Sequence, residues 1–316
     1  MRRGAPIVAS AAIAIGVVTT ATAQGYPERL VQIIAPSTPG ASADILGRVL
    51  ADGMSAQFGK PFVVINKPGA MGVLGTADVA RANADGYTLF HGATYSIVVQ
   101  PLTDKEAGYT FKSFVPICQT FKNDQVVLVP PNSPLKTARD LVEAAKHRPG
   151  QMNVGIPGIA TIPHIAMIEL EQQAGIEFNL VPFKGTAEEV QNTRSGQLEF
   201  AAVPLTVAAG SGLSMPGIFA ETRNPAMPEV PTFKEQGYDI APLSVGGLLG
   251  PAGMPTEVVR KLEAACIDIM KGEAAQRVVK STFQPEGYFA DAAGFARNLD
   301  ADLAEKTSLV AKLSLK

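Results

Sequence analysis

The sequence predicts an α/β fold with largely parallel strands. Short apolar runs rich in valine, isoleucine and leucine alternate with segments of helical periodicity, as expected for strand–helix units. The joints between them are rich in glycine, proline, serine and threonine. The 316 residues are enough for a large core and exceed one typical domain. We therefore expect two α/β blocks, each opening with a strand, a turn and a helix.

In the first block, the first strand runs through a turn at residues 36–44 into a helix with one apolar face. The residues of that face fall near helical spacing, namely Ile45, Leu46, Val49, Leu50 and Phe58. A glycine-rich turn at 68–75 precedes a second helix. Its glycines, at 69, 72 and 75, fit neither the dinucleotide nor the P-loop signature, so we interpret them as sites of close packing. The expected strands lie at 31–35, 62–65 and 87–90.

The second block repeats this pattern. Its strands are expected at 126–129, 152–155, 178–181 and 198–203, and its helices at 141–145, at 164–173 and between Thr186 and Gly196. A return strand at 245–250 then leads into a long C-terminal helical section. The ligand-facing turns of such a fold follow the carboxyl ends of the strands. The turns at 36–44 and 155–164 are therefore the pair that we expect to matter.

The N-terminal 23 residues resemble a secretion signal rather than part of the fold. Arg2 and Arg3 precede an apolar run at 7–18, and Ala21-Thr22-Ala23 fits the small-residue pattern before a cleavage site. The apolar run is short for a membrane span, which disfavours the alternative of an uncleaved anchor. We therefore expect cleavage after Ala23 and an exported, soluble mature protein.

Composition excludes several partners and chemistries. A net charge of −2 with 18% charged residues gives no basic surface for nucleic acid or an acidic membrane. The two cysteines are too few for a disulfide framework. They could pair in an oxidising compartment, but Cys118 lies in an apolar strand-like run and Cys266 on an expected helix. This placement favours two buried thiols over a bridge.

The first turn is the strongest candidate for a binding site. A strand stops at Pro36, and the turn that follows enters a helix whose free N–H groups and dipole favour an anion. Ser42 and Asp44 can cap that helix, and Asp44 more naturally orients the loop than touches an anion, since like charges repel. We expect hydroxyl groups and backbone to surround a carboxylate at Ser37, Thr38, Pro39, Gly40, Ala41 and Ser42.

Other strand ends supply further candidates. The second-block turn offers Gly158, Ile159, Ala160, Thr161 and His164, of which Thr161 is the better contact. A packed or capping role for His164 is favoured over metal binding, because neither other histidine lies at a suitable spacing, and we expect no metal and no cofactor. Whether Thr94, Tyr95 and Ser96 donate hydroxyls or form a surface loop stays open. Phe183 and Gly185 form another strand-to-helix turn.

The motifs, taken in order, resemble the Bug family, the periplasmic substrate-binding proteins of tripartite tricarboxylate transporters. Each motif is weak alone, and the order along the chain carries the resemblance. The matching pieces are Tyr26-Pro27, the Pro-x-x-Pro-Gly turn ending at Gly40, Asn66-Lys67-Pro68-Gly69-Ala70, Asp85-Gly86-Tyr87-Thr88-Leu89, Gly158-Ile159-Ala160-Thr161, Val181-Pro182-Phe183-Lys184-Gly185, Pro228-Glu229-Val230-Pro231-Thr232 and Pro251-Ala252-Gly253-Met254-Pro255.

The resemblance implies a two-lobed periplasmic binding protein of type II-like fold, with a central ligand cleft and hinge strands. Residues 24–125 with 246–316 would form the first lobe, and 126–245 the second. It also implies a periplasmic monomer that holds a small carboxylate by backbone N–H groups, hydroxyls and water rather than by an arginine. Hinge closure would present that ligand to the membrane components of a transporter. The ligand would be a dicarboxylate or an aromatic or partly apolar acid.

Some positions depart from the family pattern. Alanine stands at 41 and 160, where glycine is usual, and Val203-Pro204 replaces an acidic residue followed by asparagine. The change at Val203 removes a polar contact and favours a more apolar ligand tail, which we expect Val203 itself to contact. The region 205–220 is also shorter than usual, which affects the wall of the second lobe.

Two other function classes stay open. An exported hydrolase of small carboxylic esters would need catalytic groups, yet the chain has no Gly-x-Ser-x-Gly elbow and no His-Glu-x-x-His. A ligand-sensing domain of a signalling system uses the same two-lobed fold. The secretion signal disfavours a transcriptional regulator. We therefore expect a binding protein and no enzyme.

Overall fold

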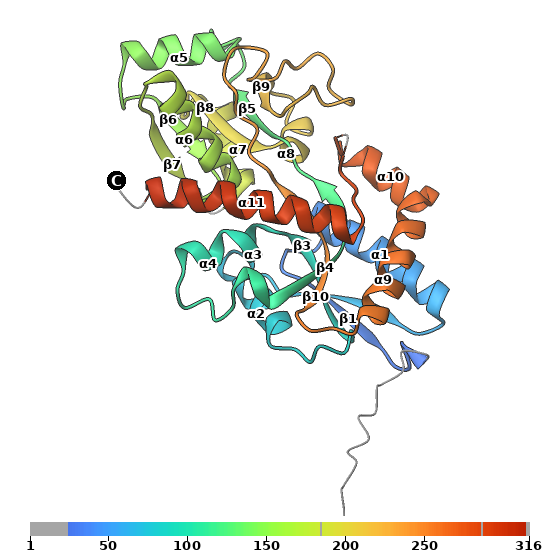
Figure 1. Ribbon diagram of the computed structural model, residues 1–316. Helices are drawn as coiled ribbons and strands as arrows, with labels where there is room; N and C mark the ends of the chain where they lie inside the picture. The colour runs from blue at the N-terminus through green and yellow to red at the C-terminus, as the bar shows by residue number, and fades with distance from the viewer. Residues whose placement is uncertain (1–24, 184, 286, 314–316) are drawn as a thin grey trace, which may run out of the picture.

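The computed structural model describes residues 25–183, 185–285 and 287–313, together with the fold that they form (Figure 1). The expected secretion signal at 1–23 and its cleavage site lie outside these residues. Among the described helices, none has the length and apolar character needed to cross a membrane.

The first sheet has the strand order β2-β1-β3-β10-β4. β1 pairs in parallel with β2 and β3, whereas β10 pairs antiparallel with β3 and β4. The strands are β1 (Val31–Ala35), β2 (Phe62–Asn66), β3 (Thr88–Ala93), β4 (Phe114–Lys122) and β10 (Val245–Pro251). The associated helices are α1 (Ser42–Phe58), η2 (Ala70–Gly72), α2 (Val73–Ala80), α3 (Tyr95–Val98), α4 (Gln100–Thr103), η3 (Phe111–Ser113), α9 (Thr256–Lys271), α10 (Glu273–Ser281) and α11 (Ala292–Leu313).

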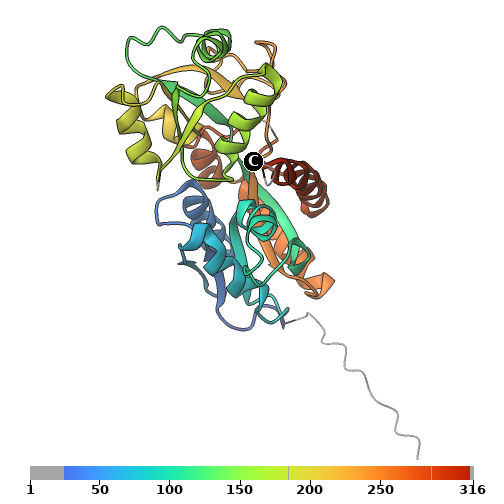
Figure 2. The same cartoon turned by 90° about the vertical axis from the view of Figure 1, so that its left-hand side faces the viewer.

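The second sheet has the order β7-β6-β8-β5-β9. β6 pairs in parallel with β7 and β8, and β5 pairs antiparallel with β8 and β9. The strands are β5 (Gln125–Val129), β6 (Asn153–Ile156), β7 (Asn179–Pro182), β8 (Phe200–Pro204) and β9 (Ser214–Phe219). The helices are α5 (Ala138–His147), α6 (Ile162–Ala174), α7 (Thr186–Arg194) and α8 (Leu205–Ala209). Figure 2 shows the two sheets as separate lobes, one above the other.

The expectation of largely parallel strands is wrong, because both sheets are mixed. The chain leaves the first sheet at the end of β4, enters the second directly at β5, and returns at β10. The strands by which the chain enters each sheet are antiparallel to their neighbours: β10 to β3, and β5 to β8. An unexpected strand, β9, lies at the edge of the second sheet, where its Pro216 is tolerated and where proline and glycine weaken the sequence signal for a strand.

Each sheet has its own apolar core. Leu46 and Leu50 of α1 are fully buried against the first sheet, together with Val31 and Ile33 of β1. Ile45, expected on the same face, is exposed instead. The second sheet buries Val127 and Phe200 beneath α5 and α6. Helix α5 begins with a capping box between Thr137 and Asp140, which satisfies N–H groups at its start.

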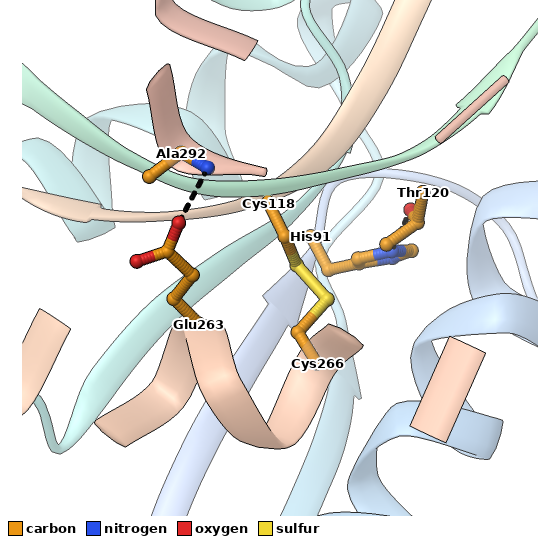
Figure 3. The surroundings of a disulfide bond; sticks show 6 residues. All are labelled: His91, Cys118, Thr120, Glu263, Cys266 and Ala292. Carbon is orange, nitrogen blue, oxygen red and sulfur yellow. Dashed lines mark hydrogen bonds between the residues drawn. A yellow bond between two sulfur atoms is a disulfide. The ribbon is translucent and has the colours of Figure 1, made fainter. Parts of the chain in front are cut away.

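A disulfide ties the first sheet to the helix that follows β10. Cys118 on β4 and Cys266 on α9 are bonded, so the expectation of two free thiols is wrong, although both residues are fully buried (Figure 3). The two cysteines lie 148 residues apart, and only the return of the chain through β10 brings them together. Nearby, the Ala292 N–H donates to Glu263 Oε1 at 2.9 Å and joins the start of α11 to α9.

The C-terminal helix α11 lies along the junction between the lobes (Figure 1). It contacts β4 of the first sheet and the helix α3, which follows β3 of that sheet. Near its end, Leu309 packs against Ile162 and Ile165 of α6, which belongs to the second sheet. This helix therefore contacts both lobes.

Candidate functional site

A cavity of about 260 Å³ opens where the carboxyl ends of β1 and β3 face the second sheet. This is the position at which α/β sheets bind ligands. Most of its lining comes from the first sheet and its helices, and the second sheet adds Pro204 and Thr206. The lining residues are Pro36, Ser37, Ala41, Ala43, Met71, Gly72, Gly92, Ala93, Tyr95, Ser96, Phe121, Asn123, Pro204 and Thr206.

The start of α1 borders this cavity and has no side-chain cap among the described side chains. Its N-cap is Ala41, which lines the cavity and has no hydrogen-bonding side chain. The expectation that Ser42 or Asp44 caps the helix is wrong. Ser42 is the first helical residue and its side chain lies outside the described part, while Asp44 accepts a hydrogen bond from the Gly40 N–H at 2.9 Å. The first amides of α1 therefore stay available to a ligand.

Asp44 holds the turn in place rather than facing the cavity. It is buried and forms an ion pair with Arg48 at 2.9 Å, and its Oδ1 accepts a hydrogen bond from the Asn66 amide at 2.8 Å. Burial alone would raise the pKa of Asp44, but the hydrogen bonds from Arg48, Gly40 and Asn66 together hold that pKa below its usual value. Arg48 also neutralises the charge, so Asp44 does not repel an anion bound at the turn.

Ser37 carries the most informative atom of the cavity. Its side chain lines the cavity, yet its Oγ is buried and has no hydrogen-bond partner among the described residues. A buried hydroxyl without a partner costs about 1–3 kcal/mol. A ligand oxygen in the cavity would remove that cost. Thr38, Pro39 and Gly40 of the same turn are exposed and do not line the cavity.

The residues after β3 divide between the cavity and the core. Tyr95 and Ser96 line the cavity, whereas the Thr94 hydroxyl is buried 2.9 Å from the Val245 carbonyl oxygen and 3.1 Å from Asp302 Oδ2. Of the two alternatives left open for Thr94, a hydroxyl for the ligand or a surface loop, this structure shows neither, because the hydroxyl bonds within the core. Burial raises the pKa of Tyr95 to about 12, so its hydroxyl is neutral at physiological pH.

The second-sheet turn faces the first sheet at η2. A Cβ built on Gly158 would lie 4.0 Å from Met71 Sδ. Within the turn, the Thr161 hydroxyl donates to the Gly158 carbonyl at 2.8 Å, and the Ala160 N–H donates to His164 Nδ1 at 2.9 Å. Burial lowers the pKa of His164, which is consistent with a neutral ring that accepts this bond. Ile159 and Ala160 line a second cavity rather than the first.

Three expected contacts lie away from both cavities. Val203 is fully buried in an apolar cluster of the second sheet, and Phe183 packs against the same cluster. Gly185 is exposed with open space around it. The neighbour of Val203, Pro204, lines the first cavity instead, because successive residues of a strand point to opposite faces.

Several lining residues were not expected from the sequence. Asn123 lies in the two-residue crossover between β4 and β5, and Thr206 lies on α8 directly after β8. The strand-end rule that identifies Ser37 would also identify Pro204 and Thr206. No such signal marks the other three: Met71 lies in a short 3-10 turn, Phe121 lies inside β4, and Asn123 lies in the crossing between the sheets.

The electrostatics of the cavity suit an anion held without a countercharge. No lining residue is an aspartate, glutamate, lysine, arginine or histidine. The polar groups are hydroxyls, one amide side chain and the backbone at the start of α1. Such donors and the positive end of a helix dipole can hold a carboxylate. Among the described residues there is also no cluster of three or more His, Cys, Asp or Glu side chains that could hold a metal ion.

Comparisons with known proteins find a matching family, curated relatives and solved structures. The family described as "Tripartite tricarboxylate transporter family receptor" matches residues 46–315. A UPF0065 protein of Cupriavidus necator is 32% identical, over 98% of this chain and 95% of the relative. Protein BugT of Bordetella pertussis is 26% identical, over 91% and 94%. A solved structure of a TctC solute binding protein from Polaromonas, without ligand, is 27% identical with a TM-score of 0.77, over 91% of this chain and 99% of that one.

Proposed function

This chain belongs to the tripartite tricarboxylate transporter receptor family, and from that premise we propose that it captures a small carboxylate between its two lobes for uptake. The observation that carries this proposal concerns the described residues: the Ser37 hydroxyl has no partner among them, it lies beside the uncapped start of α1, and no charged side chain lines the cavity. The carboxylate oxygens accept hydrogen bonds from these donors, and the helix dipole stabilises the negative charge.

The donors on the first lobe are sufficient for a useful affinity. A micromolar Kd requires about 8 kcal/mol. Hydrogen bonds to a charged group contribute about 1.5–3 kcal/mol each, and ordering of the ligand offsets part of the sum. Three or four such bonds therefore reach the required scale without an arginine.

Closure of the lobes around the ligand completes the capture. On this proposal the lobes are close to the bounds expected from the sequence, residues 24–125 with 246–316 and residues 126–245; β5 of the second sheet begins one residue earlier, at Gln125, and β10 of the first sheet begins at Val245. The two crossings between them lie side by side, because the Asn123 N–H donates to the Ser244 carbonyl at 2.8 Å. Asn123 also lines the cavity, so a ligand touches the hinge itself. A ligand that contacts both lobes stabilises the closed state over the open one.

The proposed setting is the periplasm. The protein is exported by the N-terminal signal, acts as a monomer, and delivers its ligand to membrane components of a tripartite transporter. It needs no cofactor or metal, binds no nucleic acid, and performs no reaction on the ligand. Uncharged donors around the carboxylate support binding without chemistry, because no lining residue is a nucleophile paired with a base.

A thermal-shift screen of carboxylic acids tests the proposal. A ligand selective for the folded state raises the apparent stability, and calorimetry then gives the Kd. The panel contains aliphatic, hydroxy, aromatic and nicotinate-like acids, and the matching methyl esters are the control for the carboxylate. Esters that bind as well as the acids would refute the anion site. Mass spectrometry of the ligand after prolonged incubation distinguishes binding from hydrolysis, since any ester turnover would favour the exported hydrolase.

A further inference from the structure

We propose that a second compartment beside the anion cavity holds the far end of the ligand and selects acids with a neutral, apolar tail over dicarboxylates. This inference rests on the proposed carboxylate capture and adds the class of acid. The compartment has a volume of about 350 Å³ and lies between the two lobes. It is lined by Ala70, Met71, Gln100, Thr103 and Asp104 from the first lobe and by Ile159 and Ala160 from the second.

A thin barrier of side chains separates the compartment from the anion cavity. Met71 lines both spaces. Tyr95 lines the first and Gln100 the second, and the Gln100 amide donates to the Tyr95 hydroxyl at 2.6 Å. The Tyr95 hydroxyl also lies 3.6 Å from Met71 Sδ. The barrier therefore consists of these three side chains, and only Met71 belongs to both sides.

Met71 is suited to open the barrier. Its side chain is 56% exposed, although it is large and apolar. A methionine side chain has three rotatable bonds and adapts to the shape of a ligand. Rotation of this side chain joins the two spaces without breaking the hydrogen bond between Gln100 and Tyr95. An acid that places its carboxylate at Ser37 can then extend its tail past Met71.

Of the three polar side chains that line the second compartment, two already form hydrogen bonds within the protein, and the third is Asp104. The Gln100 amide binds Tyr95, and the Thr103 hydroxyl lies 3.2 Å from the Val99 carbonyl oxygen. The remaining walls are apolar, from Ala70, Ala160 and Ile159, whose side chain is 58% exposed. An exposed isoleucine at this position gains from covering an apolar tail.

Asp104 is the one charged residue that lines the compartment, and its charge disfavours a second carboxylate. Its Oδ1 accepts a hydrogen bond from the Glu106 N–H at 2.9 Å, and no ion pair to Asp104 occurs among the described residues. The adjacent Lys105 and Glu106 are both exposed and opposite in charge. A carboxylate at the far end of the ligand would meet a like charge and lose its hydration, whereas a methyl group would not.

The first experiment compares hexanoate with adipate by calorimetry, because these acids share a chain length and differ in the second carboxylate. The wild-type protein should bind hexanoate more tightly. Asp104→Asn should shift the affinity ratio toward adipate by about fivefold, the scale of one like-charge contact near water. Lys105→Gln removes a neighbouring charge of opposite sign and should shift the ratio the other way or not at all. A wild-type preference for adipate, or a ratio that Asp104→Asn leaves unchanged, would overturn the inference.

The second experiment tests the passage at Met71. Met71→Trp should lower the ratio of hexanoate to propionate affinity by at least about tenfold, because the larger ring blocks the tail and hexanoate has three more methylenes to bury than propionate. Leu74→Trp is the matched control, since Leu74 is equally exposed nearby and lines neither space. Equal effects of the two variants would overturn the inference that the ligand tail passes Met71. If no acid of any class binds the wild-type protein, carboxylate capture itself fails; if other acids bind and hexanoate does not, only this inference fails.

Discussion

Replacing Ser37 by alanine should weaken ligand binding and stabilise the free protein at the same time. The Ser37 hydroxyl is buried in the cavity wall without a partner among the described residues. In the free protein this hydroxyl costs about 1–3 kcal/mol, so its removal should raise the free energy of unfolding by about 1 kcal/mol. In the proposed complex, the same hydroxyl would donate to a charged carboxylate, and its loss should cost about 1.5–3 kcal/mol of binding, or a rise in Kd of about tenfold or more.

The assay pairs calorimetry, with an acid from the screen, with urea unfolding of the free protein. Ser133→Ala is the control, because Ser133 is also buried but its Oγ accepts a hydrogen bond from the Leu135 N–H at 3.2 Å. This control should lose about 1 kcal/mol of stability and keep its Kd. The reasoning is refuted if Ser37→Ala keeps the Kd of the wild type, or if it destabilises the free protein as much as the control does.

Three further predictions concern stability and pH. Cys118→Ala with Cys266→Ala should lower the free energy of unfolding by up to about 5 kcal/mol, because the bond closes a loop across 148 residues; urea unfolding that shows no loss contradicts this. Burial raises the pKa of Glu189 to about 8 from 4.5, and neither carboxyl oxygen has a partner among the described residues. The folded state thus favours the neutral acid, and stability should fall as pH rises from about 4.5 through 8. Glu189→Gln should flatten that fall and be more stable than wild type above pH 8; an unchanged slope contradicts it. Burial lowers the pKa of His91 to about 4, so this residue should cost stability as pH falls from about 6.5 to 4. His91→Phe should reduce this loss of stability when thermal unfolding is measured across that pH range. An unaltered loss would contradict the lowered pKa of His91.

The family and the two-lobed α/β fold could be predicted from the sequence, and both are confirmed. The signal for each element is local. Alternating apolar runs mark the strands, and Pro36 and Gly40 mark the turn that borders the cavity. A strand end is visible in the sequence because the change of period and the turn residues fall within a few positions of one another.

The features that could not be predicted from the sequence are those that depend on contacts between distant parts of the chain. Thr94 and Ser96 follow the same strand, yet one hydroxyl binds the Val245 carbonyl and the other residue lines the cavity. Their position after a strand does not define which way each side chain points. The disulfide and the antiparallel return of β10 likewise depend on segments more than a hundred residues away. Asn123 reaches the cavity only because both crossings meet there.

The chemistry of the anion cavity explains why its ligand is hard to identify from that cavity alone. Backbone N–H groups at the start of α1 can donate hydrogen bonds to the oxygens of any carboxylate, because such contacts leave the rest of the acid untouched. Discrimination between acids must therefore come from residues beyond the first contact. On the inference proposed above, those residues are Met71 and Asp104, one adaptable and apolar and the other charged. A substitution at Met71 or Asp104 should change which acid binds most tightly, whereas Ser37→Ala should lower the affinity for all acids by a similar factor.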